Sequence, residues 1–100
     1  MTDAIAAVEY QALARRAIIR NVKQEAAALL ERGPCYRQAK LAPLVGVVES
    51  YLPPTSRIVS KARREARLFA AGHWAADVNR LIALRGHLLA RRFERRMEAR

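Results

Sequence analysis

Hydrophobic side chains recur along the chain every three or four residues, the spacing that places them on one face of an α-helix. The first such segment is predicted to be a helix from a cap at Thr2 or Asp3 to about Arg32, where Gly33 and Pro34 stop it. Its apolar positions fall on one side, and we expect them to form a core and oligomerisation stripe. That stripe includes Ile5, Val8, Ile19, Val22 and Leu29.

The second segment, residues 35–52, is less regular. Proline lacks the backbone N–H and clashes with the preceding turn, so we expect a short helix to about Ala42 and another that begins near Pro43. Gly46 lies inside an apolar run, which suggests a close contact between helices. A strand over residues 44–48 is the alternative, but it would have no obvious partner strand. Pro53 and Pro54 end the segment.

Two further helices are predicted in the second half of the chain. The third runs from a cap at Thr55 and Ser56 to about residue 71, and its narrow apolar seam ends near Phe69. After a turn at Gly72, the fourth helix runs from about residue 75 to the C-terminus, with Trp74 as the packing anchor at its entry. Because the apolar period is three to four and not two, the sequence predicts an all-α fold.

The lengths of these helices indicate the overall shape. At 1.5 Å per residue, the first helix would be about 43 Å long and the last about 38 Å. A compact domain of this size has a radius of gyration of only about 13 Å. The two long helices must therefore form an elongated bundle of about four helices, or pack their protruding ends against a second copy. We expect a homodimer, because the stripe of the first helix extends along its whole length.

Charge divides the single domain, residues 1–100, into two halves. The formal net charge is +10. Residues 1–50 hold seven Lys or Arg and five Asp or Glu, whereas residues 51–100 hold twelve and four. We interpret residues 1–54 as a near-neutral scaffold and oligomerisation half, and residues 55–100 as a basic half that faces an anion. Nucleic acid is the commonest anionic partner of that size.

The candidate binding residues lie on the third and fourth helices. Cations near a helix C-terminus offset the helix dipole, and Glu94 and Glu98 can pair with one or two of them. That leaves the last helix net positive at its end. Rows of basic side chains on one helix face can reach successive phosphates. The candidates are Arg57, Lys61, Arg63, Arg64, Arg67, Arg91, Arg92, Arg95 and Arg96.

The sequence predicts a small nucleic-acid-binding regulatory or accessory protein that contacts phosphates. The main alternative is a non-enzymatic helical adaptor or inhibitor that binds an acidic surface of a partner protein. A membrane surface is a weaker candidate. A helix-turn-helix is disfavoured, because the third helix is long, the expected reading face includes Asp77, and His73 occupies a position that suits an apolar residue.

Enzymatic chemistry finds little support. His73 and His87 lack metal-ligand spacing, and we expect both at the surface or at helix ends. No phosphate-binding glycine loop is present, so no catalytic residue, metal or cofactor is predicted.

The single cysteine, Cys35, excludes an internal disulfide and is expected to be a small, partly buried apolar residue. It suits a reducing cytoplasm, and the chain starts without the pattern of a signal peptide. The size, the composition and the lack of catalytic motifs suit a small regulatory protein of a bacterium, a phage or a mobile element.

Overall fold

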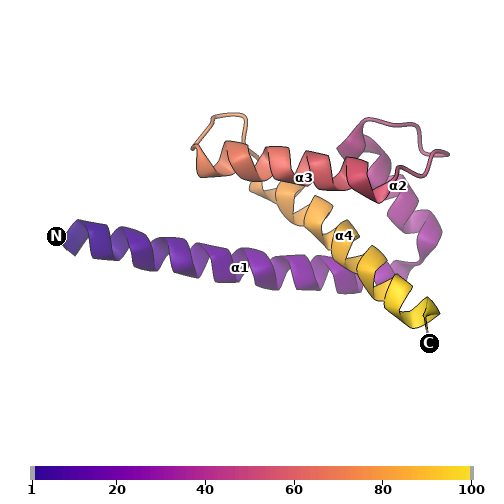
Figure 1. Cartoon of the computed structure of the whole chain (residues 1–100), viewed down its shortest axis with the longest axis horizontal. Coiled ribbons are helices and arrows are strands. Elements are labelled where there is room, and N and C mark those ends of the chain that lie inside the picture. The colour runs from indigo at the N-terminus through magenta and orange to yellow at the C-terminus, as the bar shows by residue number, and fades with distance from the viewer. Residues whose placement is uncertain (1, 100) are drawn as a thin grey trace.

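The computed structural model describes the backbone of residues 2–99 and the side chains of residue 9 and residues 12–99. Within this range the chain forms four helices and no strand, which confirms the all-α prediction (Figure 1). The helices are α1 (Thr2–Arg32), α2 (Pro34–Val45), α3 (Thr55–Ala70) and α4 (Val78–Glu98).

Helix α4 is the central element of the fold. It crosses the molecule between α3 and α1, and its contacts with these two helices are the most extensive in the protein (Figure 1). Helix α2 lies at one end and contacts the other three. The molecule measures 51 × 30 × 20 Å and has a radius of gyration of 15.4 Å. A compact chain of this length has about 13 Å, so the predicted elongated bundle is confirmed.

Two separate hydrophobic clusters hold the helices together. The larger one joins α2, α3 and α4 and contains the buried residues Leu41, Val45, Ile58, Ala62 and Leu84. The smaller one joins α1 to α4 and contains Ala26, Leu29 and Ala90. Both clusters include residues of α4, so this helix connects the α2–α3 layer to α1.

A close contact between α1 and α4 forms at Gly86. A Cβ atom added at this position would lie 2.6 Å from Cγ and 2.9 Å from Cβ of Glu25. Real Cβ atoms essentially never approach so closely. Gly86 therefore allows the two helix backbones to approach at the point where they cross.

The second segment differs from its prediction at two positions. Helix α2 continues through Pro43 and ends at Val45, because the last turn carries Leu41 and Val45 into the core cluster. Gly46 does not form a close helix contact. It ends α2 in the left-handed conformation, with φ of 70°, and it is exposed. Glycine suits this helix-ending position because it has no side chain to clash.

The entry to α4 also differs from its prediction. The helix begins at Val78, where the carboxylate of Asp77 caps it by accepting hydrogen bonds from the backbone N–H groups of Asn79 and Arg80. Trp74 is not a packing anchor, since 89% of it is exposed. The turn that carries it lies outside both core clusters.

The stripe of α1 is covered over only part of its length. Leu29 is buried and Val22 is half-buried against the rest of the molecule, whereas 54% of Ile19 is exposed. Ile5 and Val8 lie outside the described side chains. Among the described residues, the stripe is thus a core element near the end of α1 and a surface element at Ile19.

Two general features complete the fold. Cys35 is exposed, contrary to its predicted partial burial, because it lies in the first turn of α2 and does not join either core cluster. In the part of the chain described, none of the helices combines the length and apolarity needed to cross a membrane.

Candidate functional site

The outer side of α3 is basic along its length. Ile58, Ala62 and Glu65 point inward and are buried, so the arginines between them face away from the core. Four of the predicted residues are exposed there and a fifth, Lys61, is half-buried. The exposed four are Arg57, Arg63, Arg64 and Arg67. The inward position of Glu65 leaves this side of α3 without an acidic side chain.

Helix α4 carries a second exposed row of arginines. Arg85, Arg92 and Arg96 are spaced by seven and four residues, so they lie on one side of the helix. All three are exposed. Arg85 also lines a shallow depression between α3 and α4, together with Arg63 and Arg67. The packing of α3 on α4 therefore joins the two rows.

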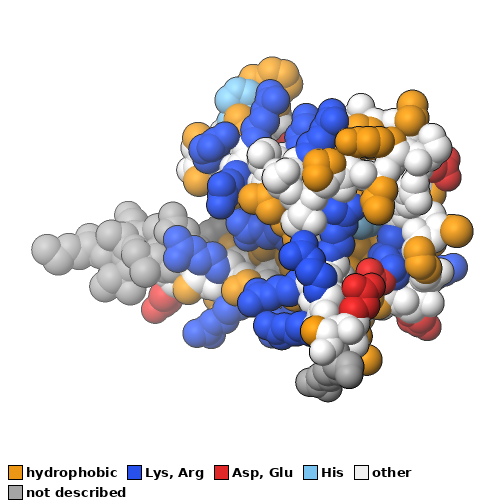
Figure 2. Space-filling model, turned by 45° about the vertical axis from the view of Figure 1, so that its right-hand side comes forward, with side chains coloured by type: hydrophobic (Ala, Val, Ile, Leu, Met, Phe, Trp, Pro, Cys, Tyr) orange, Lys and Arg blue, Asp and Glu red, His pale blue; other side chains and the backbone are white. Residues whose placement is uncertain are grey.

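We call this combined feature the α3–α4 basic surface. It comprises Arg63, Arg67, Arg85, Arg92 and Arg96. Figure 2 shows basic side chains gathered in a band on one face of the molecule, from α3 in the upper part toward α4 and α1 below. The sequence alone could not show that the third and fourth helices present their arginines together.

Arg91 and Arg95, which we predicted as anion contacts, also make hydrogen bonds within the fold. Arg91 donates hydrogen bonds to the carbonyl oxygen of Pro53 at 2.9 Å and to Oγ1 of Thr55 at 3.2 Å. Arg95 donates to the same hydroxyl at 3.1 Å. Burial lowers the pKa of Arg91, and the neighbouring Arg95 lowers it further. These two arginines connect the end of α4 to the beginning of α3.

Two acidic side chains of the basic half, Glu65 and Glu94, form ion pairs within the fold. Glu65 forms an ion pair with Arg80, with 2.9 Å between Oε1 and the guanidinium nitrogen, and this pairing raises the pKa of Arg80. Glu94 pairs with Arg37 of α2 and not with the arginines of its own helix. These are the only two ion pairs among the described residues, so the α3–α4 basic surface has no internal counter-charge there.

Lys61 and Arg64 occupy the other flank of α3. They line a second depression, to which Arg80 and Glu65 also contribute. Glu65 is buried, with only 7% of it exposed. The predicted basic residues of α3 therefore divide between two depressions, one on each side of the helix, while Arg57 lies near its beginning and lines neither of them.

His87 is buried, although we predicted a surface position. Only 3% of it is exposed, because this side of α4 packs toward α2. Burial lowers the pKa of His87 to about 4, and the positive charges of Arg91 and Arg37 contribute to the shift. Among the described residues, no group of three or more His, Cys, Asp or Glu side chains is placed to hold a metal ion.

Arg85 and Arg80 line the two depressions beside α3, but the sequence analysis did not include them among the candidate binding residues. Arg85 lies seven residues before Arg92 and could have been found by extending that row toward the N-terminus. Nothing in the sequence pairs Arg80 with Glu65.

A scan against models of protein families and searches of curated proteins and solved structures find no match to this chain. Function is therefore inferred from the side chains described above.

Proposed function

We propose that this protein binds nucleic acid through backbone phosphates, as a regulatory or accessory factor. The observation that supports the proposal is the α3–α4 basic surface, whose five exposed arginines have no acidic partner among the described residues. A solvated face of a stable helix usually mixes both signs of charge. Here Glu65 and Glu94 form ion pairs with Arg80 and Arg37, so neither neutralises the arginines of this surface.

The chemistry of arginine suits a phosphate partner. Its planar guanidinium presents five N–H donors and stays charged, and it can bind two phosphate oxygens at once. Arg92 and Arg96 are one turn apart, so their backbones are separated by about 6 Å along the helix axis. Neighbouring phosphates of one strand of a duplex are separated by about 3.4 Å along its axis. Spacings of this order allow the row to reach several phosphates of one strand.

The experiment compares two variants that lose the same charge. The first replaces Arg85, Arg92 and Arg96 with glutamine. The second replaces Arg16, Arg20 and Lys23, which line a depression on α1, with the same residue. Affinities for duplex DNA, single-stranded DNA and RNA are measured at several salt concentrations by fluorescence anisotropy.

We expect the wild type to bind with a steep dependence on salt. Each phosphate contact contributes about 0.9 to the log–log slope for a duplex, so loss of three contacts should reduce the slope by roughly 2.7. The α1 variant should lose much less. Equal losses in both variants would show that net charge alone drives binding, and no binding by the wild type at low salt would refute the proposal.

A specific observation supports an acidic protein partner as the second candidate. The depression between α3 and α4 has an apolar floor that includes Val59 and Leu88, surrounded by Arg63, Arg67 and Arg85. An acidic amphipathic helix would bury its apolar side on this floor and pair its carboxylates with the arginines. This candidate gains support if nucleic acid fails to bind and an acidic helical peptide binds instead.

A further inference from the structure

The depression that contains Glu65 has an unusual hydrogen-bond acceptor. Oε1 of the buried carboxylate accepts a hydrogen bond from Arg80, but Oε2 has no hydrogen-bond partner among the described residues. Buried carboxylate oxygens are normally hydrogen-bonded, because a charge without partners is unfavourable in a protein interior. Less than 1 Å² of Oε2 is exposed. Glu65 is one of the residues that line the depression, so an N–H donor bound there is a candidate partner for Oε2 once the side chains over it shift.

The rim of the same depression is positive. Lys61, Arg64 and Arg80 surround the single carboxylate of Glu65. A matching ligand therefore combines an anionic group for the rim with an N–H donor for Oε2. The depression has a volume of about 360 Å³, within the range of pockets that take small ligands. A nucleotide meets both requirements, since it joins a phosphate to a base whose edge carries N–H groups.

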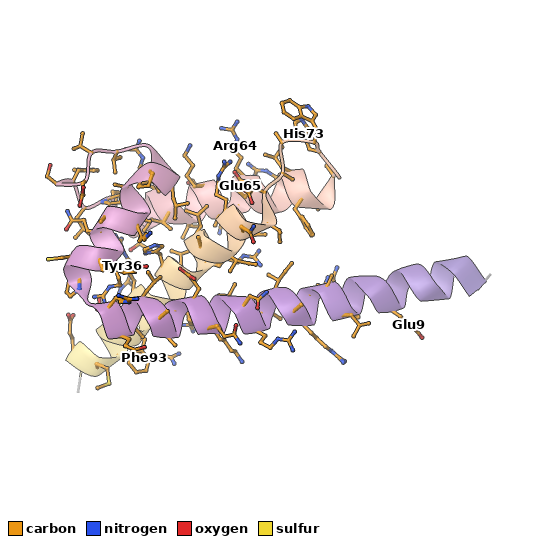
Figure 3. The ribbon with its side chains drawn as sticks, turned by 180° about the vertical axis from the view of Figure 1, so that it is seen from behind. Glu9, Tyr36, Arg64, Glu65, His73 and Phe93 are labelled. Atoms are coloured by element: carbon orange, nitrogen blue, oxygen red, sulfur yellow. The ribbon has the colours of Figure 1, made fainter. Side chains whose placement is uncertain are left out.

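An exposed aromatic residue is the sequence neighbour of a residue that lines this depression. Trp74 immediately precedes Ala75, which lines the depression, and 89% of the tryptophan is exposed. Large aromatic side chains are usually much more buried. The ring of His73 stacks beside it, with 5.5 Å between centroids and 26° between planes. Figure 3 shows that His73 and Arg64 project from the same side of the α3–α4 layer. Trp74 thus offers a flat face on which a base can stack.

We infer that this depression receives one unpaired base of a single nucleic-acid strand. Oε2 of Glu65 accepts a hydrogen bond from an N–H group of the base, Lys61 and Arg64 bind adjacent phosphates, and Trp74 stacks on a neighbouring base. The inference rests on the proposed function and specifies its substrate. In a duplex the base edges are paired and the bases are stacked on one another, so the site selects single strands.

The test measures what the bases contribute to binding. Three probes of equal length are used at one salt concentration: a single-stranded oligonucleotide, the same strand without bases, and the duplex. The proteins are the wild type, Glu65→Gln, Trp74→Ala and the control Phe93→Ala. Phe93 is half-exposed on α4 and lies far from the labelled residues of this site (Figure 3). Circular dichroism verifies that each variant is folded.

We expect the wild type to bind the base-bearing strand roughly tenfold more tightly than the strand without bases, as one stacked base commonly contributes. Glu65→Gln and Trp74→Ala should each remove most of this difference. Binding of the strand without bases should be unchanged in Trp74→Ala and should not be weakened in Glu65→Gln, because that change only removes a negative charge. Phe93→Ala should preserve it. Trp74 is the single tryptophan of the chain, so stacking should also quench the intrinsic fluorescence only when bases are present.

Failure of the inference and failure of the proposed function give different results. If all three probes bind equally and tryptophan fluorescence does not change, the base site is refuted while phosphate binding stands. If no probe binds at low salt, both are refuted. Trp74→Ala keeps the test decisive even if Glu65→Gln does not fold, because the exposed indole makes little contribution to the core.

Discussion

Acidification should destabilise this protein through His87. The imidazole is buried, and its pKa in the folded protein is lowered to about 4, whereas an unfolded chain has the ordinary value of 6.5. As the pH falls below 6.5, the unfolded chain takes up a proton that the folded protein does not bind. The stability associated with neutral His87 is therefore present above pH 6.5 and is lost as the pH falls toward 4.

The size of the effect follows from the difference between the two pKa values. One pKa unit corresponds to about 1.4 kcal/mol, so the full loss below pH 4 is about 3 kcal/mol. Between pH 7.5 and pH 5, His87 alone should lower the free energy of unfolding by about 2 kcal/mol. The free energy of unfolding of a typical domain is about 5–15 kcal/mol, so this loss is a large share of it.

Urea unfolding followed by circular dichroism at several pH values measures this loss. Two variants separate His87 from the carboxylates that titrate in the same range. Between pH 7.5 and pH 5, the free energy of unfolding of His87→Gln should fall by about 2 kcal/mol less than that of the wild type. His73→Gln, at an exposed turn, should show the same fall as the wild type. Equal pH dependence in the wild type and in His87→Gln would refute the reasoning.

Three further changes test the packing, the capping and the association of the helices. Gly86→Ala should lower stability by about 1 kcal/mol in chemical denaturation, because overpacking against Glu25 costs about 1–3 kcal/mol and the better helix propensity of alanine offsets about 1; a stabilised variant would show that Glu25 moves aside freely. Asp77→Ala should cost about 1 kcal/mol by removing the cap of α4, and an unchanged melting temperature would contradict this role. The homodimer stays a prediction. If a second copy covers the exposed part of the α1 stripe, Ile19→Glu should halve the mass measured by light scattering, and a monomeric wild type would exclude the dimer.

The helices could be predicted because their signals are local. Hydrophobic periodicity and the breaks at Gly33, Pro53 and Gly72 are properties of neighbouring residues, and they place the first, third and fourth helices to within a few residues. The course of the chain at Pro43 is not a local property. A proline disfavours a helix, but burial of the residues around it in the core cluster outweighs that preference.

The candidate site was less predictable because it depends on which helix faces which. Arg91 and Arg92 are neighbours of the same type, yet one is bound to the start of α3 and the other is exposed. Only the position of α3 distinguishes them. The burial of His87 has the same origin, because it follows from the side on which α2 packs. Composition indicates a basic surface, but tertiary packing decides which arginines belong to it.

The central position of α4 has a consequence for synthesis on the ribosome. Chains are made from the N-terminus, and domains usually fold once their parts are available. Both hydrophobic clusters of this protein include residues of α4. Neither cluster can be completed until α4 has left the exit tunnel. Until then, the apolar side chains of the first three helices that contact α4 stay exposed. A pause before α4 is translated would prolong that exposure, and rapid translation of α4 would shorten the time during which the nascent chain can aggregate.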